Sequence, residues 1–233
     1  KIQAALNSTA LAGISTNIDY LRQVCAWDRF ITGDVATRAL ESFEFEPHCV
    51  EIVQPGTYTS IQDYPGRKGY WDIGVPPSGP MDDYAFRLAN RIVGNHEKAA
   101  GIEATIVGPE IKFHQDAVIA LTGAQTDATL EGESVAFWEP LTVTAGQTLK
   151  MGKAITGCRT YLAIRGGFDV PEYLGSRSTF ALGQFGGHAG RTLRASDMLA
   201  VSQSKVAACT TPVPAYDAQS APYELIPEYP VST

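Results

Sequence analysis

The sequence predicts a mainly β protein with some α-helix, in which a short helical segment precedes a closed or sandwiched β structure. Three observations support this prediction. Apolar residues recur every three or four positions as far as about residue 45, which is the period of an amphipathic helix. From residue 50 onward the chain instead forms short runs rich in β-branched residues. Glycine or proline interrupts these runs about every eight to twelve residues, as in β-barrels and sandwiches.

Residues 1–45 are expected to form one helical unit. The first helix should end at Gly13, and Ser15 or Thr16 could cap the second, because short polar side chains accept hydrogen bonds from the first backbone N–H groups of a helix. A third short helix is expected after Gly33. The apolar positions that define the three helices are Leu6, Leu11, Ile18, Leu21, Val24, Val35, Ala39 and Leu40.

The β-rich unit is expected to span residues 50–204, and residues 205–233, which lose all periodicity, to form a linker or extended segment. One helix interrupts the strands between residues 81 and 93, with Ser78 as its cap and Gly94 as its stop. This helix should plug or flank the β structure. The expected strands are residues 50–54, 102–107, 117–122, 128–130, 141–144, 148–151, 161–165 and 198–202.

The composition excludes several classes of protein. The 233 residues carry 18 basic and 25 acidic side chains, a net charge of -7, with no basic cluster for a nucleic-acid backbone. No apolar run reaches the roughly 18 to 20 residues of a membrane span, and the opening residues 1–6 are typical of a helix, not of a secretory leader. Cys25, Cys49, Cys158 and Cys209 lie far apart without a CxxC pair. We therefore expect reduced thiols, no metal site and a cytoplasmic location.

The first segment with possible chemistry is the glycine- and proline-rich stretch at residues 62–82, which contains Arg67, Ser78 and Gly79. Glycine and proline fix such loops in one shape and let backbone N–H groups approach a ligand closely. Placed just before a helix, the stretch could hold a carboxylate or an oxyanion. The other interpretation is a set of tight turns that end in a helix cap.

The second such segment spans residues 165–191. Arg177, Ser178, His188 and Arg191 offer fixed donors for an anionic or ureido group. No Lys follows the last Gly as in a phosphate-binding Walker loop. Ser178 lacks the G-x-S-x-G surroundings of a serine hydrolase. The other interpretation is an ordered glycine-rich loop whose arginines bind backbone carbonyl groups.

Two known families resemble these segments. Residues 5–40, above all the run at 11–21, resemble the closing segment of biotin carboxylase C-terminal lobes. The remainder, to about residue 202, resembles allophanate hydrolase subunit 2, the biotin-dependent carboxyltransferase family. The residues that carry this second resemblance are Gln62-Asp63, Gly66-Arg67, Gly69, Gly74-Val75, Ser78-Gly79-Pro80-Met81-Asp82, Ala89-Asn90, Val93-Gly94-Asn95, Glu103, Gly108-Pro109 and the cluster at 166–191.

In this order the two halves resemble the biotin-dependent urea carboxylases, the carboxylase part of urea amidolyases. The resemblance implies a cyclophilin-like β-barrel and an ATP-dependent ligase whose carboxyltransferase moves a carboxyl group from carboxybiotin to urea, giving allophanate. It also implies biotin on a separate carrier domain and a second partner, a subunit 1-like domain. Residues 50–204 would be the first half of the carboxyltransferase domain. The ATP-binding glycine loop and the biotinylated Met-Lys-Met motif are absent, so the piece is expected to be inactive alone.

The site residues follow from combining the resemblance with the two loops. The expected catalytic residues are Ser78, Arg177, Ser178 and His188. The expected cofactor-binding residues are Arg67, Gly79, Gly187 and Arg191. Two other functions remain open: a domain like the 5-oxoprolinase subunit of the same family, which is a separate chain, and a non-enzymatic cyclophilin-like module that binds or regulates a partner.

Overall fold

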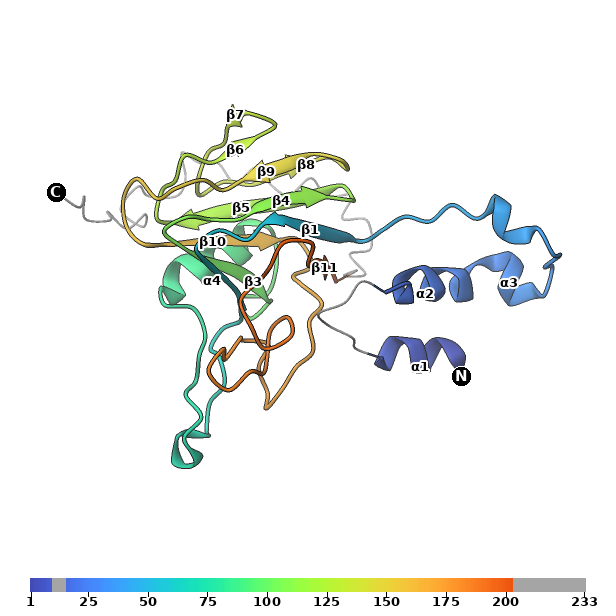
Figure 1. The fold of residues 1–233 in the computed structure, drawn as a ribbon, viewed down its shortest axis with the longest axis horizontal. Coiled ribbons are helices and arrows are strands. Elements are labelled where there is room, and N and C mark those ends of the chain that lie inside the picture. Colours follow the sequence, from blue (N-terminus) through green and yellow to red (C-terminus); the bar gives the residue numbers. More distant parts are fainter. Residues whose placement is uncertain (10–15, 203–233) are drawn as a thin grey trace.

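The computed structural model describes residues 1–9 and 16–202, and begins with a helical segment. Its elements are α1 (Ile2–Ser8), α2 (Ile18–Ala26), α3 (Asp28–Thr32) and the 3₁₀ turn η1 (Ala39–Ser42). The helices lie beside the sheets and are joined to them by an extended segment (Figure 1). Tyr20 of α2 packs edge-on against Phe43 and Phe45, with ring centroids 5.5 Å apart in both pairs. Aromatic contacts therefore hold the helical segment together.

The third helix is not where the sequence predicted it. α3 precedes Gly33, which adopts a left-handed φ of 77° and ends the helix, and only a 3₁₀ turn follows. Glycine takes this conformation without strain, which makes it a common residue just past a helix end. The prediction therefore placed Gly33 on the wrong side of the helix. The proposed cap Ser15 lies outside the described residues, and α2 has Asn17 at its N-cap.

The β unit consists of two antiparallel sheets (Figure 1). The six-stranded sheet has the order β11-β1-β4-β9-β6-β7, and the five-stranded sheet has the order β2-β3-β10-β5-β8. The strands are β1 (Cys49–Gln54), β2 (Tyr58–Gln62), β3 (Gly101–Thr105), β4 (Glu110–Phe113), β5 (Ala117–Gly123), β6 (Thr129–Leu130), β7 (Glu133–Ser134), β8 (Leu141–Val143), β9 (Thr148–Lys150), β10 (Arg159–Ile164) and β11 (Met198–Ala200).

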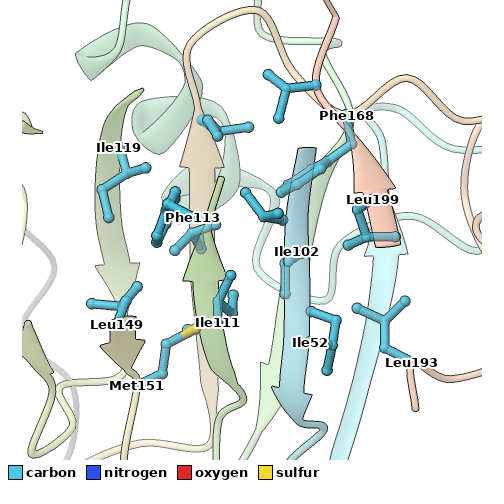
Figure 2. Close-up of a cluster of buried hydrophobic side chains, with 14 of the residues drawn as sticks. Ile52, Ile102, Ile111, Phe113, Ile119, Leu149, Met151, Phe168, Leu193 and Leu199 are labelled. Atoms are coloured by element: carbon cyan, nitrogen blue, oxygen red, sulfur yellow. The ribbon is translucent and has the colours of Figure 1, made fainter. Parts of the chain in front are cut away.

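The hydrophobic core lies between the facing sides of the two sheets. Ile52 and Ile111 come from the six-stranded sheet, and Ile102 and Ile119 from the five-stranded sheet; all four are fully buried. Figure 2 shows these side chains pointing toward one another. Burying aliphatic side chains of this size stabilises the fold by roughly 1.5–3 kcal/mol each, so this core sets the relative position of the sheets.

Helix α4 (Asp83–Ile92) covers the outer face of the five-stranded sheet. Alternate residues of a strand point to opposite faces, and in β10 Leu162 joins the core between the sheets while Ala163 packs with Ala89 and Val93 of the helix. The predicted helix is confirmed and flanks the β structure, but its cap is wrong. Asp82, not Ser78, is the N-cap, and its carboxylate accepts the N–H of the third helical residue.

The fold class is confirmed as mainly β with some α-helix, preceded by a short helical segment. Within residues 1–9 and 16–202 the strand ladders form two packed open sheets, and none closes them into a barrel. Strands β2, β4 and β7 were missed, and each expected strand is present within a few residues. The expected linker at 205–233 lies outside the described residues. In the described part, no helix is long and apolar enough to cross a bilayer.

Candidate functional site

Two long loops leave the five-stranded sheet and meet each other. The first, residues 63–82, runs from β2 to α4, and the second, residues 165–197, runs from β10 to β11. The second loop covers the open edge of β2: the N–H of Thr179 donates to Ile61 O, and the N–H of Leu193 donates to Thr59 O, both at 2.9 Å. Pairing an edge strand with a loop satisfies its backbone groups. The two segments singled out in the sequence are therefore in direct contact.

Asp63 joins the loops from the first side. Its carboxylate accepts hydrogen bonds from the hydroxyls of Ser176 and Ser178, both at 2.6 Å, and from the N–H of Arg177 at 2.8 Å. Asp63 is only 7% exposed, and both serines are buried. Hydrogen bonds to a charged acceptor are stronger than neutral ones. Asp63 thus fixes the backbone of the second loop at Arg177.

Arg67 joins the loops a second time. Its Nε donates to the carbonyl of Tyr173 at 3.1 Å and its Nη2 to that of Ser178 at 3.0 Å, while the guanidinium lies over the ring of Phe185 with its carbon 4.8 Å from the ring centre. The side chain is 1% exposed. Burial lowers the pKa of Arg67 from its ordinary value, and the nearby Asp63 opposes that change. Arg67, which was predicted to bind the cofactor, therefore donates to backbone carbonyls of the second loop.

Side chains of the five-stranded sheet bind the end of the first loop. The N–H of Gly79 donates to Gln62 Oε1 at 3.0 Å, and the N–H of Met81 donates to the buried carboxylate of Glu103 at 2.8 Å. Tyr161 donates its hydroxyl to Glu103 and accepts the N–H of Asp82 at 2.7 Å. Burial raises the pKa of Glu103 above its ordinary value, against the opposing effect of these donors. Hydrogen bonds to polar side chains of the sheet therefore fix the turn that contains Ser78 and Gly79.

The second loop has its own anchor at Asp197. Arg191 donates two hydrogen bonds to this carboxylate, at 2.7 and 2.8 Å, and the N–H of Arg194 adds a third at 2.8 Å. Burial would raise the pKa of Asp197, but the donors outweigh burial and hold it below its ordinary value. His188 Nε2 lies 3.4 Å from the same carboxylate. Burial lowers the pKa of His188 despite this neighbour, so the neutral imidazole predominates at neutral pH.

A cavity of about 520 Å³ lies between the helical segment and the second loop. This volume is within the range of small-molecule sites. Arg177 and His188 line it from the loop, and Asp19 and Arg22 line it from α2. The Arg177 side chain is 39% exposed; its Nε donates to a carbonyl at 3.1 Å, and its Nη1 lies 3.6 Å from the exposed carboxylate of Glu172. Because so loose an ion pair at the surface is readily exchanged, Arg177 has donors available for a ligand.

Of the four predicted catalytic residues, two line the cavity and two do not. Arg177 and His188 line the cavity, and the N–H of Gly187 donates to Arg177 O at 3.0 Å just behind them. Ser78 adopts a left-handed φ of 56° in the turn of the first loop, where it is half-buried and does not line this cavity. Ser178 is fully buried. Its hydroxyl anchors the loop and is not accessible to a ligand in this conformation.

Sequence reasoning assigned no role to the residues that hold the loops, although three of them carry the family resemblance: Asp63, Gln62, Glu103, Tyr161 and Asp197. Asp63 stands beside Gly66-Arg67 in a motif quoted for the family resemblance, and that motif was the available signal. Nothing local in the sequence pairs Asp63 with serines 113 and 115 residues later. In the described residues, no group of three or more His, Cys, Asp or Glu side chains could hold a metal ion.

Comparison with known proteins decides the family. A family model described as "Carboxyltransferase domain, subdomain A and B" matches residues 73–230, well over half of the chain. The chain belongs to this carboxyltransferase domain family. The predicted resemblance to a carboxyltransferase family is thereby confirmed.

The urea amidolyase relatives are much longer than this chain. The chain is 52% identical to a urea amidolyase of Lachancea kluyveri over 228 residues, which are 98% of the chain and 12% of that protein. A crystal structure of the Kluyveromyces lactis urea amidolyase matches with a TM-score of 0.85 and 50% identity, covering 100% of the chain and 14% of that structure. A 5-oxoprolinase subunit of Escherichia coli is 38% identical over 67% of the chain and 50% of its own length. The chain thus spans about an eighth of the urea amidolyases.

Proposed function

We propose that this chain is part of the carboxyltransferase of a biotin-dependent urea carboxylase, which transfers a carboxyl group from carboxybiotin to urea to give allophanate. One observation carries the proposal: the urea amidolyase match extends over 98% of the chain, whereas the match to the 5-oxoprolinase subunit extends over 67%. A match over 98% of the chain includes the helical segment. That segment accompanies the carboxyltransferase domain in the urea amidolyases.

Arg177 and His188 are the residues that we assign to ligand contact. Carboxyl transfer to a weak nitrogen nucleophile depends on holding the two reactants in line and on fixed donors for developing negative charge. Arg177 presents N–H groups to the cavity from a backbone that Asp63 holds rigid. His188 is buried and mainly neutral, so it can donate or accept one hydrogen bond without adding charge.

The other predicted residues receive positioning roles in this proposal. The Ser178 hydroxyl, Nε and Nη2 of Arg67, and the Arg191 guanidinium donate hydrogen bonds within the two loops. Gly187 lets the second loop pack closely, since a Cβ there would overlap the Thr179 side chain, and Gly79 supplies a left-handed φ of 87° in the first loop. Ser78, which was predicted to be catalytic, lies in the turn before α4 and away from the cavity, so it too receives a positioning role. These residues would act by holding Arg177 and the first loop in place.

The donor set fits a carboxylated ureido ring. Carboxybiotin offers a carboxylate and a ureido oxygen, both acceptors, and the half-exposed Arg177 guanidinium is a planar donor suited to such groups. Biotin, when delivered on its carrier domain, supplies the carboxyl group. Arg177 would hold that carboxylate, and the loop behind it would keep the guanidinium oriented.

The remainder of the enzyme would supply the missing parts. The chain accounts for 12–14% of the urea amidolyases that it matches, so ATP-dependent biotin carboxylation, the carrier and a subunit 1-like domain would reside elsewhere in one polypeptide. The helical segment leaves Ile2, Ile31 and Leu40 exposed at 67%, 65% and 52%. Such apolar surface suits helices that end a larger module. We place the enzyme in the cytoplasm and expect the isolated chain to be inactive.

The proposal is tested by Arg177→Ala in the full-length polypeptide. Loss of one donor to a developing oxyanion typically costs ~3 kcal/mol, so urea-dependent allophanate formation should fall by about a hundredfold. Biotin-dependent ATP cleavage should keep its rate, because it occurs on another module. The matched control is Arg91→Ala, which removes an arginine 64% exposed on α4.

Three outcomes would contradict the proposal. If Arg177→Ala leaves allophanate formation unchanged, Arg177 does not contact the substrate. If the wild-type enzyme acts on 5-oxoproline and not on urea, the chain belongs with the 5-oxoprolinase branch of the family. A protein that catalyses neither reaction would support a binding or regulatory module instead.

A further inference from the structure

Residues 67–77 of the first loop form a stiff projection, which we call the arm. At its base the N–H of Arg67 donates to Pro77 O at 2.6 Å, and nearer the tip the N–H of Val75 donates to Tyr70 O at 3.0 Å. The tip is the 3₁₀ turn η2 (Trp71–Ile73), closed by Gly74 in a left-handed conformation. In Figure 1 the arm, drawn in teal, extends well away from the sheets. Backbone hydrogen bonds at two levels of the arm therefore hold its shape.

The tip carries two large exposed apolar side chains. Trp71 is 70% exposed and Ile73 is 67% exposed. An isolated apolar side chain on a surface is ordinary, but here an indole and a branched aliphatic group stand together on a projection that contributes nothing to the core. Tryptophan is the residue most enriched among interface residues that dominate binding. A rigid tip also loses little conformational entropy on docking.

We propose that the arm docks its Trp71–Ile73 tip into an apolar groove on a part of the same polypeptide outside this chain. The groove should accept a flat indole beside an aliphatic side chain and offer a hydrogen-bond acceptor to the indole N–H, since buried indoles use that donor. The exposed Lys68 and Asp72 beside the tip should meet polar groups at its rim.

The size of the tip favours this occupant over a second copy of the chain. A stable interface between separate proteins buries about 800 Å² on each partner, whereas a tryptophan buries only about 150–250 Å². Two side chains on a narrow arm fall short of that area. A tether raises the effective concentration of the groove to the millimolar range, so a small contact is sufficient within one polypeptide. In the urea amidolyases that match, about seven eighths of the polypeptide lies outside the matched region and could contain such a groove.

The arm shares its root with the second loop. Arg67 begins the arm and also binds the carbonyls of Tyr173 and Ser178. Docking would therefore hold both glycine-rich loops against the neighbouring domain. The docking rests only on the chain being part of a longer polypeptide, so its failure would leave the carboxyltransferase assignment intact.

Thiol labelling in the full-length polypeptide tests the proposal. Asp72→Cys places a probe between the two apolar side chains and keeps both, and Ile155→Cys, at a residue 61% exposed on the sheet unit, serves as the control. Alkylation by iodoacetamide is followed on each labelled peptide by mass spectrometry and normalised to the rate in denaturant. We expect the Asp72→Cys thiol to react at least about tenfold more slowly than the control, as for a site that opens only transiently. Adding Trp71→Ala should abolish that protection.

Each remaining outcome is decisive. Equal labelling of the two thiols means that the tip is free and overturns the proposal. Protection that disappears on dilution of the protein assigns the tip to a second copy and overturns the stated occupant. A second measurement needs no new cysteine: trypsin should cleave after the exposed Lys68 faster in Trp71→Ala than in the wild type. Equal cleavage of the two proteins would also contradict docking.

Discussion

Removal of the Asp63 carboxylate should lower the free energy of unfolding, because this side chain holds the two loops of the site together. Asp63→Ala deprives three donors of their acceptor: the buried hydroxyls of Ser176 and Ser178 and the partly buried N–H of Arg177. Hydrogen bonds to a charged group contribute about 1.5–3 kcal/mol each. The loss is less than additive, because the Ser178 hydroxyl already lies 3.2 Å from the Asp63 carbonyl and can turn to it. We expect the free energy of unfolding to fall by about 3–5 kcal/mol.

Guanidinium chloride titration of the 233-residue chain measures this change from the midpoint and slope. Asp63→Asn should lose less, since its amide oxygen still accepts both hydroxyls, although its NH₂ group then faces the N–H of Arg177. Asp72→Ala, which removes an exposed carboxylate from the arm, is the matched control and should change the free energy by no more than about 0.5 kcal/mol. An Asp63→Ala loss below about 1 kcal/mol would refute the reasoning, because single neutral hydrogen bonds reach that value.

Three other measurements test the site. Gly186→Ala should destabilise the chain by about 3 kcal/mol or more, because its Cβ would overlap a carbonyl oxygen at a φ of 74°, whereas Gly132→Ala, also left-handed but in open space, should cost only about 1 kcal/mol in the same titration. Burial lowers the pKa of His188 from its ordinary 6.5, so the unfolded chain takes up the proton first as the pH falls. The free energy of unfolding should therefore decrease as the pH drops below about 6.5. His188→Gln should make that free energy less dependent on pH between about pH 7.5 and 5.5. Burial and two carboxylates raise the pKa of Cys49 to about 11, so at about pH 8 it should alkylate more slowly than the exposed Cys158.

Local patterns in the sequence were sufficient for most of the fold. The helix α4 could be predicted because its apolar side chains recur at helical spacing and a glycine ends it. Strand β2 was missed because its buried residues include Thr59 and Ser60 and only one large apolar residue, Ile61. Its neighbours supply the burial: the second loop covers one edge and β3 pairs with the other. A pattern of hydrophobicity cannot detect a strand whose own side chains are mostly polar and whose burial comes from its neighbours.

The candidate site was predictable in its segments but not in the roles of its side chains. Glycine and arginine content located both loops, and the structure brings them together. Whether an arginine contacts a ligand or a carbonyl group depends on burial, which composition does not give. Arg67 and Arg177 look alike in sequence, yet the first is 1% exposed and bound to carbonyls, and the second faces a cavity. The anchor Asp197 is equally invisible, since its partners become neighbours only through the turn before β11.

The separation between Asp63 and its serine partners has a consequence for how the protein forms. Ser178 is 115 residues away along the chain, and contacts between such distant positions form late because closing the intervening segment costs entropy. A nascent polypeptide that has reached β5 still lacks the serines that bind Asp63. The site can therefore be completed only after residues 176–178 have been added, and a truncation before residue 176 would remove both serines together with β11, the edge strand of the six-stranded sheet.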